Sequence, residues 1–215
     1  MTKIAIAGAA GRMGRNIIRC ARNMENVLVT GAVEYENHPD LGKDAGTLAE
    51  TNEAGVNLSA DLPGALSACD VLIDFTLHTS VPANAAMAAE YGRAMVIGTT
   101  GLDSDESRAV NAAAEKIPIV WAPNMSLGIN LLFAMVRKAA NVLGSDYSIE
   151  IDETHHIHKK DAPSGTALRL GEKAAAGLEC DFNSLYAHDP EGNEKIQDPG
   201  KIVIRSHREG EVIGQ

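Results

Sequence analysis

Residues 3–14 read K-I-A-I-A-G-A-A-G-R-M-G, and this stretch decides the fold. The apolar run at its start predicts a short buried strand, and apolar residues continue with helical spacing from Ile17 to Ala21. Three glycines, at positions 8, 11 and 14, lie between strand and helix. Glycine allows a tight turn, and a helix N-terminus offers free N–H groups to a phosphate. The stretch therefore predicts a dinucleotide-binding turn, although its G-x-x-G-x-x-G spacing differs from the common G-x-G-x-x-G pattern.

Strands and helices alternate after this turn. Apolar, β-branched runs predict further strands at residues 27–33, 71–75, 94–97 and 117–121. Helical stretches are predicted at 81–91 and 104–116, and the polar residues 37–57 predict a loop-rich connection. Because each strand ends in small or polar residues, the pattern is typical of a parallel sheet with helices on both faces. We predict an α/β fold with a Rossmann-like doubly wound parallel sheet.

The ends of the predicted strands carry the residues suited to ligand binding. In doubly wound sheets, ligands bind beyond the carboxyl ends of the strands. The residues at those ends are Gly8, Glu34, Thr76, Gly98–Thr100 and Asn124. We expect one crevice to collect all of them.

Glu34 ends the second strand, twenty residues after Gly14. A carboxylate at this place accepts hydrogen bonds from the adenine ribose hydroxyls and repels a 2′-phosphate. Tyr35 follows, where an arginine would help to neutralise such a phosphate. The pair therefore favours NADH over NADPH, while Arg12 could add a charge or stack on the adenine.

The regular alternation of predicted strands and helices ends at Asn124, and the residues that follow predict a second, smaller α+β domain. Helices are expected at 127–143 and 164–176, and strands at 147–151 and 201–205. Residues 183–200 are polar and predict an excursion, and a further strand could begin at residues 212–213. We place the dinucleotide-binding domain at 1–125 and the substrate-binding, catalytic domain at 126–215.

Residues 153–166 read E-T-H-H-I-H-K-K-D-A-P-S-G-T and join proton donors to a predicted helix N-terminus. That arrangement suits an enzyme that protonates an anionic small molecule, because a helix N-terminus binds carboxylates and histidine titrates near neutral pH. Two other interpretations are a solvated surface loop and a metal site formed by His156 and His158 with neighbouring carboxylates. The spacing matches no common zinc pattern, so we predict no metal.

Composition narrows the class of protein. The formal net charge of −10 argues against nucleic-acid binding, which needs a basic surface. Three scattered cysteines predict a reducing compartment, and Cys69, just before a strand, is expected in the core. No signal peptide is visible, and no apolar run looks long enough to span a membrane. We therefore expect a cytoplasmic protein with no membrane partner.

Several motifs together resemble the 4-hydroxy-tetrahydrodipicolinate reductase family, also called dihydrodipicolinate reductases. They are G-A-A-G-R-M-G at Gly8, D-F-T at Asp74, V-I-G-T-T-G at Val96, A-P-N-M-S at Ala122 and H-H-I-H-K-K-D-A-P-S-G-T-A at His155. They follow the family's order and span nearly the whole chain. The resemblance implies hydride transfer from NAD(P)H to a cyclic dicarboxylate, with loss of water, in lysine and diaminopimelate biosynthesis.

The resemblance also implies roles for individual residues. His155 would be the general acid/base and Lys159 a proton donor, while His156, Gly165 and Thr166 would bind substrate. The implied cofactor-lining residues are Gly8, Ala9, Ala10, Gly11, Arg12, Met13, Glu34, Gly98, Thr99, Thr100, Ala122, Pro123, Asn124 and Met125. Family members are usually homotetramers and continue past the residue at which this sequence stops, which implies a C-terminally shortened chain. A nucleotide-sensing protein without catalysis and a histidine-based metal regulator are the rival functions.

Overall fold

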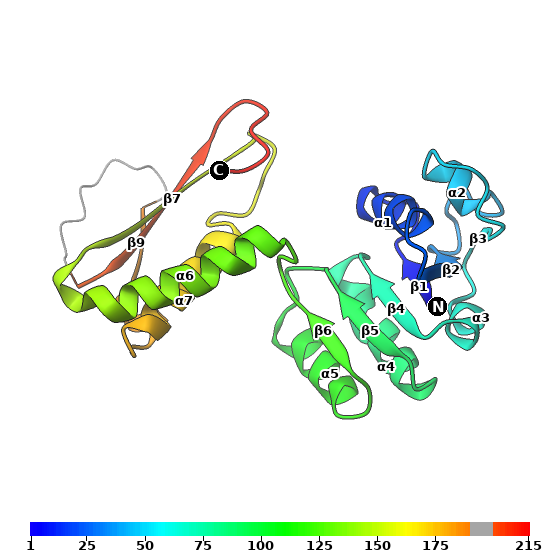
Figure 1. Ribbon diagram of the computed structural model, residues 1–215, viewed down its shortest axis with the longest axis horizontal. Coiled ribbons are helices and arrows are strands. Elements are labelled where there is room, and N and C mark those ends of the chain that lie inside the picture. The colour runs from blue at the N-terminus through cyan, green and yellow to red at the C-terminus, as the bar shows by residue number, and fades with distance from the viewer. Residues whose placement is uncertain (190–199) are drawn as a thin grey trace. The chain divides into compact units, whose positions relative to one another are not determined.

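The computed structural model describes residues 1–189 and 200–215 and divides the chain into two compact units, Met1–Ala122 and Pro123–Gln215. Each unit has its own hydrophobic core: two buried clusters lie in the first unit and one in the second. Figure 1 shows a sheet with flanking helices in each unit. The units are therefore described separately.

The first unit is built on a parallel sheet whose strand order is β3-β2-β1-β4-β5-β6. The strands are β1 (Thr2–Ala7), β2 (Val27–Val33), β3 (Leu58–Ser59), β4 (Val71–Asp74), β5 (Ala94–Ile97) and β6 (Ile119–Trp121). The helices are α1 (Arg12–Arg22), α2 (Ala45–Leu48), α3 (Leu62–Ala68), α4 (Val81–Glu90) and α5 (Ser104–Ala114), with a short 3₁₀ helix, η1, at His78–Ser80.

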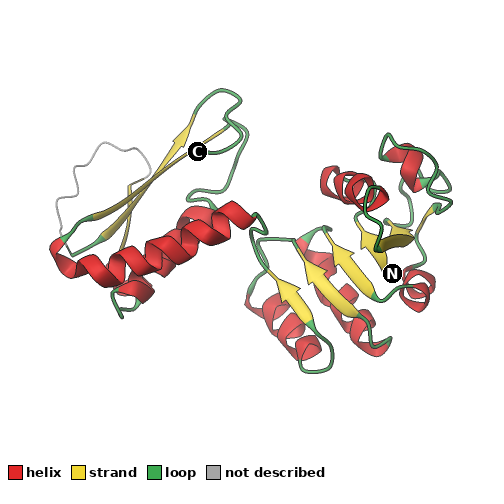
Figure 2. Cartoon of the chain, in the orientation of Figure 1, coloured by secondary structure: helices red, strands yellow, loops and turns green. Residues whose placement is uncertain are grey.

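Helices cover both faces of this sheet. Residues of α1 and α2 belong to one buried cluster, and residues of α3, α4 and α5 belong to the other. The central strand β1 contributes Ile4 and Ile6 to the first cluster and Ala5 and Ala7 to the second, because alternate residues of a strand face opposite ways. The predicted doubly wound parallel sheet is confirmed (Figure 2).

The strand register brings the predicted ligand-binding ends into one row. Ala7 lies opposite Val33 on one side and Asp74 on the other, and Asp74 lies opposite Ile97. Ile97 in turn lies opposite Trp121. The residues that follow these strand ends therefore emerge at the same edge of the sheet.

The connection after β2 contains more structure than the sequence predicted. The expected loop at 37–57 includes α2, and it is followed by β3 and α3, which the prediction left out. Asp44 stabilises α2 and its surroundings because its carboxylate accepts hydrogen bonds from the backbone N–H groups of Thr47, Ala54 and Gly55. Such local side-chain contacts have no periodic signal, and β3 is too short to show alternation.

The second unit pairs two long helices with a parallel sheet. In its described part, the elements are α6 (Leu127–Leu143), η2 (Gly144–Asp146), β7 (Ile149–His155), α7 (Gly165–Gly177), α8 (Phe182–Leu185), β8 (Tyr186–Asp189) and β9 (Ile202–Arg208). β9 lies between β7 and β8, and α7 contacts both β7 and β9. Figure 1 shows α6 running alongside α7.

Small residues allow α6 and α7 to approach closely. A Cβ added to Gly177 would come within 2.3 Å of the Arg137 carbonyl oxygen and 2.8 Å of the Ala140 side chain. Asn141 also donates from its side chain to the Gly177 carbonyl oxygen at 3.2 Å. The glycine is therefore a packing requirement of this helix pair.

Three expectations for this unit need correction. The strand predicted at 147–151 begins at Ile149 and runs on to His155, so Glu153 and His155 belong to a strand. The expected polar excursion contains α8 and β8, while its residues 190–199 lie outside the described part of the chain. Val212 and Ile213 form no strand, but Gln215 exchanges two backbone hydrogen bonds with Thr154.

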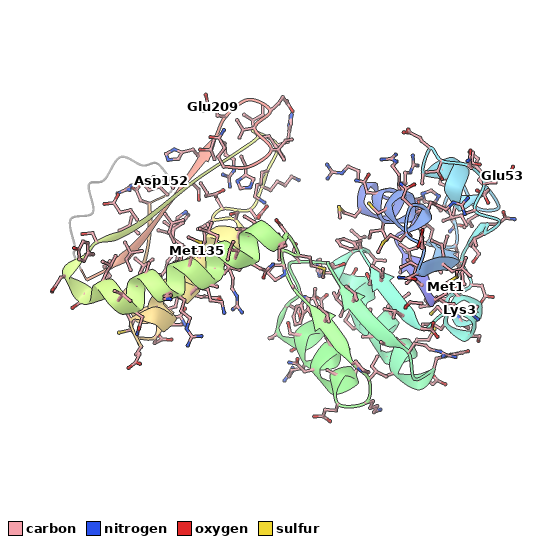
Figure 3. The ribbon with its side chains drawn as sticks, viewed as in Figure 1. Met1, Lys3, Glu53, Met135, Asp152 and Glu209 are labelled. Atoms are coloured by element: carbon pink, nitrogen blue, oxygen red, sulfur yellow. The ribbon has the colours of Figure 1, made fainter. Side chains whose placement is uncertain are left out.

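The continuous helical segment Leu127–Asp146, which comprises α6 and η2, contradicts the expectation that no apolar run is long enough to span a membrane. By length and composition it could do so, and 11% of its most apolar window is buried. Met135, labelled in Figure 3, is one of its exposed apolar residues. A single helix of this kind is weak evidence for a membrane span, because apolar helices of soluble proteins meet the same criterion. Arg137 and Lys138 also lie within the run.

Candidate functional site

The glycine turn after β1 leaves no room for larger side chains. Gly8 has a φ of +76°, and a Cβ there would lie 2.6 Å from the Phe75 carbonyl oxygen. A Cβ on Gly14 would lie 2.2 Å from the Gly8 carbonyl oxygen. Gly8 thus allows the turn, and Gly14 allows α1 to start directly against it. The free N–H groups of this helix start face the edge at which the strands end.

Glu34 closes one side of this turn. Its Oε1 accepts a hydrogen bond from the backbone N–H of Ala10 at 3.0 Å, which joins the end of β2 to the glycine turn. Tyr35 is exposed, and its ring packs edge-on against His38. Glu34 and Tyr35 line a cleft of about 630 Å³ together with Gly8 and Gly11.

A buried carboxylate ties the neighbouring strand ends together. Asp74 has no exposed surface, and its Oδ1 accepts from the Thr76 backbone N–H at 2.9 Å and hydroxyl at 2.7 Å. The Thr99 hydroxyl lies 3.4 Å from the same oxygen, and the Asn84 side-chain amide donates to Oδ2 at 2.7 Å. Asp74 therefore links the loop after β4 to the loop after β5 and to α4.

Phe75 fills the space between two predicted glycines. A Cβ on Gly98 would lie 2.1 Å from the Phe75 ring, while Gly8 meets the Phe75 backbone on the other side. The D-F-T motif at Asp74 resembles that of the family, but no site residue was predicted within it. The cleft is lined by Phe75, Thr76, Leu77, Ser80 and Asn84 in addition to Gly8, Gly11 and Glu34, whereas the predicted residues Gly98, Thr99 and Thr100 are not among its lining residues. Only the position of Thr76 at a strand end had pointed to this group.

In the second unit, the strand β7 carries an imidazole next to a buried carboxylate. His155 Nδ1 contacts Glu153 Oε2, and the His155 side chain is 20% exposed while that of Glu153 is 5% exposed. Glu153 Oε1 accepts from the Ser164 backbone N–H at 3.1 Å. Because residues 153 and 155 point to the same face of a strand, their pairing follows from the two-residue period.

Arg208, at the end of β9, holds the loop that follows His155. Its guanidinium donates to the carbonyl oxygens of Lys159 at 3.3 Å and Asp161 at 2.5 Å. It also approaches Glu153 Oε1 at 3.4 Å. The Lys159 ammonium donates to both carboxylate oxygens of Asp161, at 2.8 and 2.7 Å. Neither Glu153 nor Arg208 was predicted as a site residue.

The start of α7 presents an open helix N-terminus. Ser164 is the N-cap, and its hydroxyl accepts from the Ala167 N–H at 3.2 Å. A Cβ on Gly165 would meet no atom within 4 Å, so space lies in front of this residue. The Thr166 hydroxyl accepts from the Asn124 side-chain amide at 3.3 Å. This combination offers an anion site at the end of a 13-residue helix.

Family comparisons cover both units of the chain. The family description "Dihydrodipicolinate reductase, N-terminus" matches residues 2–125, and "Dihydrodipicolinate reductase, C-terminus" matches residues 128–215. The chain belongs to the dihydrodipicolinate reductase family. The family's activity is therefore the activity of this chain: NAD(P)H-dependent reduction of 4-hydroxy-tetrahydrodipicolinate in lysine and diaminopimelate biosynthesis.

Individual relatives support this membership. The chain is 47% identical to the 4-hydroxy-tetrahydrodipicolinate reductase of Anaeromyxobacter dehalogenans over 215 residues, covering all of this chain and 80% of the relative. It is 42% identical to the enzyme of Citrifermentans bemidjiense, with the same coverage. Among solved structures, dipicolinate-bound dihydrodipicolinate reductase from Paenisporosarcina sp. TG-14 matches with a TM-score of 0.66 and 26% identity, covering 100% of this chain and 81% of the other.

A more distant structural neighbour shares the fold alone. Aspartate semialdehyde dehydrogenase II from Vibrio cholerae matches with a TM-score of 0.54 at 13% identity, covering 98% of this chain and 68% of the other. Cys69 of this reductase is buried, and burial raises the pKa of its thiol. The thiol therefore lies in the core, as predicted, and is poorly suited to act as a nucleophile.

The remaining predicted site residues of this reductase differ in their exposure to solvent and in the unit to which they belong. Thr99 is buried and donates to the Thr76 carbonyl oxygen at 3.1 Å, whereas Thr100, Arg12 and Met13 are exposed. Ala122 ends the first unit, while Pro123, Asn124 and Met125 begin the second. The structure thus brings the glycine turn, Glu34 and the loop after β5 to one sheet edge, and His155, Lys159 and the α7 N-terminus to one part of the other unit.

The histidines of the 155–158 loop differ in their surroundings. His156 Nδ1 is buried and finds no hydrogen-bond partner within the part of the chain that the structure describes. His158 is exposed and lies 3.6 Å from Glu211. Among the described residues, no group of three or more His, Cys, Asp or Glu side chains is arranged to hold a metal ion.

Proposed function

We propose that this reductase uses His155 as the general acid/base and Lys159 as a second proton donor at the substrate ring. The observation that carries this assignment is the convergence in one short segment, residues 153–166, of a partly exposed imidazole, an ammonium group and an open helix N-terminus. Histidine can deliver a proton near neutral pH, and the helix N-terminus can hold a carboxylate.

We assign substrate binding to His156, Gly165 and Thr166. The unpartnered Nδ1 of His156 can bond a substrate carboxylate, and the open space at Gly165 lets a carboxylate approach the first N–H groups of α7. The Thr166 hydroxyl, already bonded to Asn124, can donate its own proton to the same group. A dicarboxylate fits this site because positive and donor groups predominate.

The cofactor half-site fits a nicotinamide dinucleotide. The tight approach at Gly8 and the cleft beside Glu34 supply the turn, the helix N-terminus and the ribose acceptor that such a ligand needs. We assign contacts with it to residues 8–13, Glu34, 98–100 and 122–125. When bound, the reduced nicotinamide supplies a hydride to the substrate, and His155 supplies the proton that the reduced ring requires.

We propose that NADH is preferred over NADPH. The Glu34 carboxylate stands where the adenine ribose binds in this fold, and it would repel a 2′-phosphate. Tyr35 beside it brings no positive charge. We also propose that the reductase works in the cytoplasm as a homotetramer, as is usual in the family. Light scattering during size-exclusion chromatography would test the assembly.

The decisive experiment is a coupled assay in which the upstream synthase generates the substrate and loss of absorbance is followed with each reduced cofactor. We expect oxidation of the cofactor that depends on the synthase, with a larger kcat/KM for NADH. His155→Gln is the matched negative control, because it keeps a polar side chain but removes the titrating group. Cofactor binding without any oxidation in the native protein would contradict the assignment and favour a nucleotide-sensing role.

A further inference from the structure

We propose that Glu153 and Arg208 form a positioning pair: Glu153 fixes the orientation and proton arrangement of His155, and Arg208 fixes the loop that carries Lys159. The inference rests on the proposed roles of His155 and Lys159. Neither member of the pair touches the reacting atoms in this account. Each acts through the residue that it holds.

Glu153 is placed to orient His155. Its carboxylate is nearly inaccessible to solvent, with 4% of the residue exposed, and Oε2 contacts His155 Nδ1. The other oxygen accepts from the Ser164 N–H and approaches Arg208. One carboxylate thus connects the imidazole with the N-cap of α7, so the proton donor and the anion site share a single anchor.

The carboxylate is held in its charged form. Burial alone would raise the pKa of Glu153, but the Ser206 hydroxyl, the Ser164 N–H and the charges of Arg208 and His155 outweigh it and lower the pKa. Neither Oε2 nor Nδ1 has a hydrogen-bond partner among the described residues, but the charged carboxylate in contact with Nδ1 favours a proton on that nitrogen. The second ring nitrogen, Nε2, is then the atom that exchanges a proton with a substrate, as in other enzymes in which a carboxylate fixes a catalytic imidazole.

The surroundings of Nε2 agree with this arrangement. A Cβ on Gly214 would lie 3.1 Å from His155 Nε2, so a glycine at this place leaves space beside that nitrogen. The segment is fixed by the two backbone hydrogen bonds between Gln215 and Thr154, at 3.0 and 2.9 Å. Gly214 therefore lies next to Nε2, where a larger residue would crowd the nitrogen that exchanges the proton.

Arg208 fixes the backbone of the loop rather than its side chains. Its bonds to the carbonyl oxygens of Lys159 and Asp161 come from Nε and from a terminal nitrogen. The backbone N–H of Glu209, the residue labelled at the end of β9 in Figure 3, donates to the His155 carbonyl oxygen at 2.9 Å. Arginine suits this task because its planar group offers several donors at fixed angles. Lysine would keep the charge beside Glu153 but could not span both carbonyls.

Two substitutions in the full chain separate the halves of the proposal. For Glu153→Gln we expect kcat to fall about 10- to 10³-fold, as when an orienting partner of a catalytic or metal-bound imidazole is neutralised. Loss of the carboxylate also removes a charge that favours imidazolium, so the alkaline limb of the kcat pH profile should move to lower pH. For Arg208→Lys we expect the position of that limb to stay and the substrate KM to rise about tenfold, since one or two hydrogen bonds to the loop are lost.

The controls distinguish this proposal from the roles on which it rests. If His155→Gln keeps the native rate, the assignment of His155 fails whatever Glu153→Gln does. If His155→Gln is slow but Glu153→Gln leaves the pH profile in place, only the positioning role of Glu153 is overturned. The melting temperature and the NADH dissociation constant are measured for every variant. If kcat falls only in proportion to the amount of folded protein that is lost, the positioning role of Glu153 is also overturned. Glu153→Asp keeps the charge and should restore the position of the alkaline limb.

Discussion

At the scale of single residues, the loop that carries Lys159 is held by a side chain that lies far from it in the chain. His155, Lys159 and the Ser164 turn stand out in the sequence because histidines, lysines and a helix start are adjacent. Arg208 is 49 residues away from Lys159 in the chain and joins it only through tertiary structure. A single sequence gives no sign of such a contact, since nothing local marks Arg208 as different from other arginines.

Gly165 allows a residue-scale test of the anion site. Gly165→Ala should leave the melting temperature nearly unchanged, because the new methyl group would meet open space. It would, however, occupy the space in front of the helix N-terminus, so we expect the substrate KM to rise about tenfold, comparable with the loss of one charge-assisted hydrogen bond. Steady-state kinetics with Ala176→Ser, at an exposed position on the same helix, serve as the control. An unchanged KM would move the carboxylate site elsewhere.

His155 gives the clearest catalytic prediction. His155→Gln should lower turnover by about 10²- to 10⁴-fold, the usual contribution of general acid–base catalysis. Affinity for NADH should barely change, because the glycine turn and Glu34 belong to the other unit. Single-turnover kinetics and nicotinamide fluorescence titration measure the two quantities. A variant as fast as the native enzyme would remove His155 from the mechanism.

Tyr35 tests the basis of cofactor preference. Tyr35→Arg should shift the ratio of kcat/KM values towards NADPH, because an arginine beside Glu34 would offset its charge and bind the 2′-phosphate. Tyr35→Gln controls for loss of the ring contact with His38. If the ratio of the two cofactors stays constant in the arginine variant, Tyr35 does not govern the choice.

At the scale of elements, the periodicity of apolar residues predicted the long strands and helices but not the short ones. The prediction matched β2, β5 and α6 in full because apolar runs mark them from end to end. It missed β3, which has only two residues, and α2 and α3, which are capped by Asp44 and Asp61. It also ended β7 too early, because the alternation of apolar residues stops at Ile151 while pairing with β9 continues to His155.

Asp74 is the element-scale feature with the sharpest consequence, since it joins two loops and a helix behind the cofactor cleft. Asp74→Asn keeps the shape of the side chain but places an amide NH₂ group among the groups that donate hydrogen bonds to Asp74. We therefore expect the free energy of unfolding to fall by about 1–3 kcal/mol. The NADH dissociation constant should rise by about tenfold as the loops after β4 and β5 lose their common anchor. Thermal unfolding and fluorescence titration would measure these effects, with the exposed Asp105→Asn as the matched control. Unaltered NADH affinity in a destabilised variant would limit Asp74 to folding.

At the scale of the whole molecule, the two units have separate hydrophobic cores. Ligands that bind only the folded state raise its stability by mass action. We therefore expect calorimetry to resolve two transitions, of which NADH raises the one that belongs to Met1–Ala122. A single transition that shifts as a whole would show that the units unfold cooperatively.

The second unit should also be sensitive to acid. Although burial alone would raise them, the pKa values of Glu153 and Asp161 are lowered by their hydrogen bonds and by nearby positive charges. Their contribution to stability is present above the ordinary carboxyl range, near pH 4, and is lost as pH falls through the lower folded-state values. Melting temperatures between pH 3 and 6 should therefore fall more steeply for native protein than for Glu153→Gln. Parallel curves would exclude Glu153 as a source of the acid sensitivity.

The position of Gly214 against His155 has a practical consequence for anyone purifying the reductase. A run of six histidines placed in the chain beside Gln215 would add competing proton donors and metal ligands next to the proposed acid. Met1 is exposed and belongs to the other unit, so a tag placed there would add no histidines to the segment that carries this imidazole.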